Sequence, residues 1–249
     1  MAIYYLCSGF GMEDCFVNKF GELLAKDLTG TKSLVAIPCS DDEELINGHL
    51  GFFKAQLEKA GIYFESVLAV NEKMSGEEIR KNIKSADMLY LMGGYPFEQK
   101  RIIDKMCIGD AIKKFDKVIL GISAGAMNMS EYIIMVTDGE NSDQTRIEKG
   151  LSLVDFSIFP HCAFSGDEFA DSFKIGEDTV YSQKLVEVCK SRGDVYFLQN
   201  KDDKGNLKIS LIRVKNNKKE FVSIYNGKVW KLTPSGFEIE KEYIKNDLS

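Results

Sequence analysis

A serine flanked by glycines is the residue of this sequence best suited to chemistry. Residues 121–125 read Gly-Ile-Ser-Ala-Gly, a G-x-S-x-G pattern typical of a nucleophile elbow, in which a strand turns abruptly into a helix. The turn strains its central residue, so the neighbours two positions away must lack bulk. Ser123 would then stand at the N-terminus of a helix, where free N–H groups favour developing negative charge. The same pattern also fits a tight turn whose serine caps the helix.

A nucleophilic serine needs a base, and the sequence contains two histidines. His161 follows an apolar run over residues 156–160, which predicts a position just past the carboxyl end of a strand. At that edge an imidazole could accept the proton of Ser123. His49 lies in the middle of a predicted helix, and we interpret it as a surface or half-buried structural histidine.

An imidazole that acts as a base also needs a group that orients it. Asp138 is the first candidate because it too follows an apolar, strand-like run. Asp202, after the predicted strand over residues 195–198, is the rival, and both stay open because aspartate in such contexts also forms turns. The backbone N–H groups of Ala124 and Gly94 would form the oxyanion hole, since glycine lets the main chain approach closely.

These candidates depend on elements that alternate along the first half of the chain. Strands are predicted over residues 3–7, 34–38, 62–70, 88–92 and 118–122, and helices over 16–28, 41–60, 75–85 and 97–115, with a break at Gly109. This alternation predicts a parallel sheet with helices on both faces, in which ligands bind beyond the carboxyl ends of the strands. Gly94 and Ser123 each follow a strand and would share that edge.

Beyond the elbow the predicted elements are less regular. Further strands are predicted over residues 132–136, 156–159 and 195–198, a polar surface loop over 140–150 and a helix over 179–192. From residue 207 the apolar period changes to two, and Asn226-Gly227 is a strong turn signal. We therefore predict an α/β fold, a three-layer αβα sandwich with a mostly parallel central sheet. A single domain would comprise this core over 1–205 and a C-terminal antiparallel β-hairpin extension over 206–249.

Composition argues against several kinds of partner and cofactor. The chain has 249 residues, 44% hydrophobic and 28% charged, and its net charge of −6 argues against nucleic acid. We expect no membrane partner, because no apolar run reaches the length of a span and the N-terminus lacks a signal-peptide pattern. Six scattered cysteines without C-x-x-C spacing predict reduced thiols in a cytoplasmic protein, with no metal and no cofactor. A homodimer stays open.

Three motifs together resemble those of peptidase family S51, which includes aspartyl dipeptidase (dipeptidase E) and cyanophycinase. They are Gly-Ile-Ser-Ala-Gly-Ala at residues 121–126, Gly-Gly-Tyr-Pro-Phe at 93–97 and Phe-Pro-His at 159–161. The resemblance covers about residues 3–198 and implies a fold related to class I glutamine amidotransferases. It also implies Ser123 as the nucleophile, His161 as its histidine and Asp138 as the acid.

The function that the resemblance implies is that of a serine peptidase acting on short peptides, including dipeptides with an acidic first residue. Tyr95 and Pro96 stand where the family often carries Asn-Thr, which leaves the acidic specificity open. Two other functions stay open. One is a small-molecule-binding protein of the same fold that has lost catalysis. The other is a serine esterase of the α/β-hydrolase type, since Ser123, Asp138 and His161 also follow that order.

Overall fold

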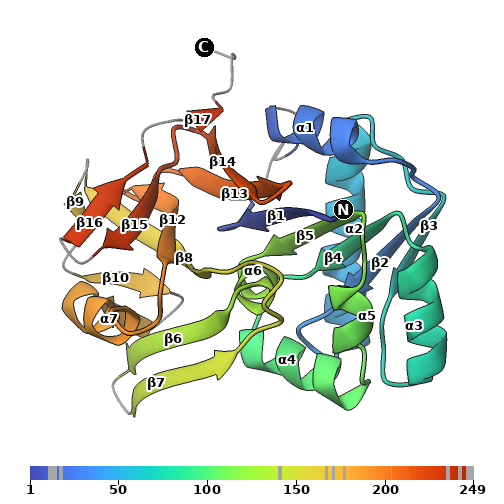
Figure 1. Ribbon diagram of the computed structural model, residues 1–249, viewed down its shortest axis with the longest axis horizontal. Coiled ribbons are helices and arrows are strands. Elements are labelled where there is room, and N and C mark those ends of the chain that lie inside the picture. The colour runs from blue at the N-terminus through green and yellow to red at the C-terminus, as the bar shows by residue number, and fades with distance from the viewer. Residues whose placement is uncertain are drawn as a thin grey trace.

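A central sheet with parallel middle strands organises the structure (Figure 1). Its strands, in order across the sheet, are β17 (Tyr243–Ile244), β14 (Lys218–Ile224), β13 (Ile209–Lys215), β1 (Ile3–Cys7), β5 (Val118–Ile122), β4 (Met88–Leu91), β2 (Ser33–Ile37) and β3 (Ser66–Ala69). From β1 to β3 neighbouring strands are parallel, as the sequence predicts. The predicted third strand begins later than expected, at Ser66.

The computed structural model describes residues 1–10, 16, 19–139, 142–165, 168–169, 172–175, 178–202, 204–233, 236–240 and 243–244. For some strand residues beside the gaps, Asp138 among them, it describes the main chain alone. In this part of the chain no helix is long and apolar enough to cross a membrane.

Helices cover both faces of the central sheet because successive strand residues point to opposite faces. They are α1 (Lys19–Asp27), α2 (Glu43–Lys59), α3 (Gly76–Ser85), α4 (Pro96–Lys105), α5 (Gly109–Lys113) and α6 (Ala124–Met129). Side chains of α1 and α2 pack with Tyr5 and Leu120 on one face of the sheet. Those of α3, α4, α5 and α6 pack with Leu6 and Ile119 on the other. The predicted α/β architecture with a mostly parallel sheet between helices is therefore confirmed.

The second half of the chain forms two further sheets, which lie beside the helical part in Figure 1. One contains β16 (Gly236–Ile239), β15 (Val229–Thr233), β12 (Val195–Asp202), β8 (Ser157–Ser165) and β9 (Glu168–Phe169). The other contains β10 (Ser172–Ile175), β11 (Asp178–Tyr181), β6 (Tyr132–Gly139) and β7 (Ser142–Lys149), and α7 (Ser182–Cys189) follows β11. β8 and β12 run parallel, so their carboxyl ends lie at one edge.

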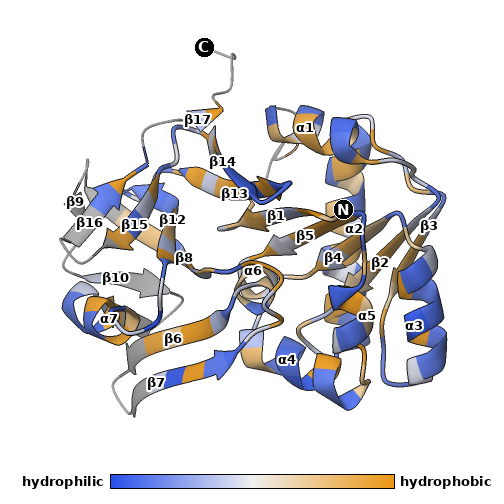
Figure 2. Ribbon diagram, viewed as in Figure 1, coloured by the Kyte–Doolittle hydropathy of each residue, from blue (hydrophilic) through white to orange (hydrophobic). Residues whose placement is uncertain are grey.

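The prediction of a surface loop over residues 140–150 is wrong, because most of this segment is β7. β7 pairs antiparallel with β6 along its whole length and lies at the edge of its sheet. Polar and charged residues are typical of an exposed edge strand, where they discourage pairing with other chains. Figure 2 shows the contrast, with β6 largely hydrophobic and β7 largely hydrophilic. Polarity alone therefore does not distinguish such a strand from a loop.

The predicted C-terminal hairpins are present, but their strands divide between two sheets. β13 and β14 form a hairpin that extends the central sheet next to β1, whereas β15 and β16 form a hairpin that joins β12. Asn216 and Asn217 make the tight turn of the first hairpin with φ values of 53° and 59°, as a type I′ turn requires. The predicted turn at Asn226-Gly227 instead connects one sheet to the other.

A buried group of charged side chains ties the β13–β14 hairpin to α1. The carboxylate of Asp27, 0% exposed, accepts hydrogen bonds from Arg213 Nε and Nη2 (2.7 Å each), Tyr5 Oη (2.7 Å) and Lys215 Nζ (2.9 Å). Burial alone would raise the pKa of Asp27, but the hydrogen bonds from Arg213, Tyr5 and Lys215 outweigh it and lower that pKa below its usual value. The ionised form of Asp27 therefore stabilises the fold.

Replacing Asp27 with asparagine is expected to lower the free energy of unfolding by about 3–5 kcal/mol, because it leaves Arg213 charged, buried and without its main partner. Chemical denaturation measures the loss. The matched control is Glu22→Gln, which removes an exposed ion pair with Lys19 and should cost less than about 1 kcal/mol. Because folding lowers the pKa of Asp27, its ionised carboxylate should add its full contribution to the free energy of unfolding above the pKa of the unfolded state. That contribution should be lost as the pH falls through the pKa of the folded state. Equal losses in both variants would contradict this role.

Candidate active site

Ser123 stands on the turn between β5 and α6 in the strained conformation that its motif predicts. Its φ is 48° and its ψ is −108°, a combination that residues with a side chain rarely adopt. Its N–H donates to the carbonyl oxygen of Cys7 on β1 (2.9 Å), which fixes the turn to the sheet. A Cβ atom on Gly125 would lie 2.0 Å from the carbonyl oxygen of Leu91, so this position accepts no side chain.

His161 faces Ser123, as the sequence predicts. Ser123 Oγ and His161 Nε2 are 2.6 Å apart, although 38 residues separate them in the chain. His161 has a φ of 63° and interrupts the regular pairing of β8 with β12. β8 carries one residue more than β12 between the pairs Phe159–Phe197 and Cys162–Gln199. We infer that this bulge turns the imidazole towards Ser123, since bulges redirect side chains in this way.

Burial keeps the imidazole of His161 neutral. Desolvation, together with the positive charge of Lys201 on β12, lowers the pKa of His161 to about 4. Above that pH the ring is neutral, and in the tautomer that carries its hydrogen on Nδ1, Nε2 can accept the hydroxyl proton of Ser123. The other histidine, His49, is exposed on α2 and lies outside this site.

As the pH is lowered, hydrolytic activity is expected to fall with a midpoint near pH 4, because His161 becomes protonated there. The ordinary pKa of histidine would put this acidic limb near pH 6.5. The profile of kcat/KM against pH measures this because it reports the ionisation of the free enzyme. The rate should change little between about pH 5 and pH 7. Lys201→Met should move the limb to higher pH by removing a positive charge near the ring. A limb centred on the ordinary histidine pKa would contradict a desolvated, neutral base.

The predicted oxyanion donors are the main-chain N–H groups of Ala124 and Gly94. The N–H group of Ala124 belongs to the first residue of α6, directly after the serine. Gly93 and Gly94 follow β4, the strand beside β5, and a Cβ atom on Gly93 would lie 3.9 Å from Cβ of Ser123. Gly94 has a φ of 139°, and a Cβ atom there would lie 2.8 Å from Cβ of Cys39. The contact with Cys39 explains why this position is glycine, and the role of its N–H group in an oxyanion hole stays a prediction.

The two candidate acids, Asp202 and Asp138, lie near the ends of different strands. Asp202 ends β12 and accepts hydrogen bonds from the N–H groups of Lys204 (3.0 Å) and Asn206 (2.8 Å), so its carboxylate caps the following turn. Asp138 lies near the end of β6, where its main chain pairs with Thr179 of β11. Its side chain lies outside the described residues, and its role in orienting His161 stays a prediction.

Sequence reasoning missed an arginine beside the loop that follows β4. Arg146 on β7 lies with its guanidinium 3.9 Å from the ring centre of Phe97, and it pairs with Glu148 (2.6 Å). Interactions with Glu148 and then with the hydroxyl of Tyr95 raise the pKa of Arg146. Recognition of β7 as a strand would have placed Arg146 and Glu148 on the same face, because residues two apart in a strand share a face.

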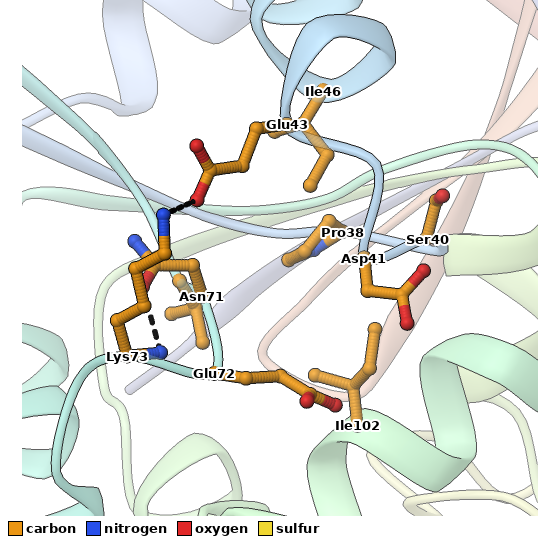
Figure 3. A pocket seen from close by; sticks show the side chains of 10 residues that line it. Pro38, Ser40, Asp41, Glu43, Ile46, Asn71, Glu72, Lys73 and Ile102 are labelled. Carbon is orange, nitrogen blue, oxygen red and sulfur yellow. Dashed lines mark hydrogen bonds and ion pairs between the residues drawn. The ribbon is translucent and has the colours of Figure 1, made fainter.

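A pocket of about 300 Å³ opens at the same edge of the sheet, beyond β2 and β3 (Figure 3). Its lining includes the carboxylates of Asp41, Glu43 and Glu72. Each has a cation beside it: Lys73 pairs with Glu43, Arg101 lies near Asp41 (3.8 Å), and Lys105 pairs with Glu72 (2.7 Å). The described part of the chain contains no group of three or more His, Cys, Asp or Glu residues placed to hold a metal ion.

Comparisons with known proteins show the family and the fold. The model of peptidase family S51 matches residues 8–202. A crystal structure from Listeria monocytogenes EGD-e, described as a candidate peptidase E protein, is 19% identical with a TM-score of 0.57, over 90% of this chain and 99% of that chain. The crystal structure of a peptidase from an acI-B1 Actinobacterium is 16% identical with a TM-score of 0.61, over 97% of this chain and 95% of that one. No curated protein matches the chain.

Proposed function

Because the chain belongs to peptidase family S51 and is therefore a serine-type peptidase, we propose that it hydrolyses short peptides with Ser123 as the nucleophile. The observation that carries this proposal is the contact of 2.6 Å between Ser123 Oγ and His161 Nε2. A strained serine that faces a neutral, partly buried imidazole is the arrangement that nucleophilic catalysis needs. The free thiols of the cysteines that the structure describes support a cytoplasmic location.

The mechanism that we propose has two halves. Ser123 Oγ attacks the peptide carbonyl carbon while His161 Nε2 takes the hydroxyl proton, and the N–H groups of Gly94 and Ala124 hold the oxyanion. His161 then returns the proton to the leaving amine, and an acyl-enzyme forms. In the second half His161 takes a proton from water as that water attacks the ester carbonyl, and it then returns the proton to Ser123 Oγ as the bond to the acyl carbon breaks, which releases the carboxylic acid. A further group must orient the imidazole, and Asp138 is the acidic candidate from the sequence.

We propose that dipeptides with an acidic first residue are among the substrates. A cation near the site would recognise such a side chain, and Arg146 lies over the ring of Phe97 at the start of α4. Glu148 pairs with Arg146, so a substrate carboxylate would have to compete with it. The Arg146→Met variant should therefore lose rate on acidic dipeptides and keep its rate on neutral ones.

A panel of dipeptides with acidic and neutral first residues, together with a small aryl ester, tests the function. We expect hydrolysis of dipeptides by the wild-type protein and none above background by Ser123→Ala. Fast cleavage of the ester without any peptide hydrolysis would indicate an esterase. Equal turnover by the wild-type protein and Ser123→Ala would overturn the assignment.

A further inference from the structure

Asn200 lies next to His161 on the neighbouring strand, although no motif indicates it. In the pairing of β12 with β8, Gln199 lies opposite Cys162 and Lys201 opposite Ala163. Asn200 stands between these positions, beside the bulge that contains His161. The two side chains therefore start from adjacent strands at the same edge of the sheet.

The side chains of Asn200 and His161 both lie close to Gly9. A Cβ atom on Gly9, which follows β1, would lie 2.7 Å from Asn200 Oδ1 and 3.5 Å from His161 Cε1. A methyl group in this place would collide with the amide oxygen. Because Gly9 has no side chain, the amide and the imidazole can share this space.

The amide oxygen of Asn200 is a buried acceptor that receives no hydrogen bond from any described residue. Leaving such a group unpaired is unfavourable, so a hydrogen bond from a donor close by would stabilise it. The imidazole of His161 can supply one: in the tautomer in which Nε2 accepts the hydrogen bond of Ser123, the hydrogen of the neutral ring is on Nδ1. Catalytic hydrogen bonds often form or tighten only when the substrate binds.

We propose that Asn200 is the positioning residue of this site: its Oδ1 accepts the Nδ1–H of His161 and fixes the tautomer in which Nε2 faces Ser123. The inference rests on the proposed function. An amide fills this role beside the catalytic histidine of papain-like proteases, so a carboxylate is not required. Among the described residues, the positive charge of Lys201 acts on the imidazole of His161 and lowers its pKa. Asp202 accepts a hydrogen bond within its own turn, from the N–H group of Asn206.

Asn200→Ala is the first test. We expect kcat on the best dipeptide to fall by about 10²-fold or more with little change in KM, since the tautomer is no longer fixed. The matched control is Asn82→Ala on α3, which should keep the wild-type rate. Asn200→Asp keeps the acceptor and adds a negative charge, so it should recover activity and move the acidic limb of kcat/KM to higher pH. A merely structural asparagine would not move that limb.

A double-mutant cycle with Gly9→Ala gives a second readout. The added methyl group should displace the amide of Asn200 and lower the rate of the wild-type protein, but have little further effect in Asn200→Ala. Circular dichroism and denaturation confirm that each variant is folded. Additive losses would contradict a shared role.

The outcomes separate this inference from the proposed function. A wild-type protein that hydrolyses no peptide would remove both. If the wild-type protein is active, Asn200→Ala keeps the wild-type rate and Asp138→Asn is strongly impaired, the inference is overturned but the proposed function stands. The positioning role would then belong to Asp138. Loss of rate in Asn200→Ala, together with the shifted limb in Asn200→Asp, would establish it.

Discussion

Replacement of Ser123 by alanine is expected to lower kcat/KM for the best peptide by at least about 10³-fold, the largest loss that any single substitution here should cause. The change removes the oxygen that bonds to the substrate carbonyl, and no acyl-enzyme can form. The variant can still bind the substrate and stabilise the oxyanion, and these two effects alone give only a modest acceleration over the uncatalysed reaction in water. Steady-state kinetics on the purified variant measure the loss.

The control for Ser123→Ala is a serine outside the site. Ser85 at the end of α3 donates its hydroxyl to main-chain carbonyl oxygens of its own helix, at Lys81 and Asn82 (3.2 Å each). Ser85→Ala should hydrolyse the peptide at the wild-type rate. Comparable losses in both variants would show that damage to the fold, and not loss of the nucleophile, explains the result.

Replacement of His161 by alanine is expected to cause a loss of similar size, about 10³-fold or more. Nε2 is the base that faces Ser123 Oγ at 2.6 Å, and without it the hydroxyl keeps its proton. Because the two residues act as a unit, the double variant should be no slower than either single one. The rates of the wild-type protein, both single variants and the double variant are measured on one substrate.

His49→Ala is the matched control for this prediction. His49 is the other histidine of the chain and lies exposed on α2, away from the carboxyl edge of the sheet. We expect its removal to leave the rate unchanged. A double variant of Ser123 and His161 that multiplies the two single losses would contradict a joint role.

The parallel core and the nucleophile could be predicted because local pattern and physical constraint agree there. Strand β5 is apolar throughout, and Gly125 leaves room for the carbonyl oxygen of Leu91. The partnership of His161 with Ser123 could be predicted too, but the predicted position just past the end of a strand is wrong, because His161 lies within β8. The orientation of His161 could not be predicted, since it depends on a bulge relative to β12, a strand more than thirty residues further along the chain.

The remainder depends on contacts that leave no mark in a single sequence. β7 is polar because it is an edge strand, so its residues look like a loop until β6 is placed beside it. Asn200 carries no motif, and it is singled out by a space that Gly9 leaves free on a third element of the fold. Aspartates such as Asp138 and Asp202 attract attention by their chemistry, yet Asp202 forms a turn.

Reaction of the folded protein with a fluorophosphonate probe tests most directly whether Ser123 is an activated nucleophile. Mass spectrometry of the digested product identifies the labelled residue. We predict one adduct, on Ser123, that forms rapidly in the native protein, slowly in His161→Ala and not at all after unfolding in denaturant. A native protein that does not react, or that reacts at another serine, would contradict the account.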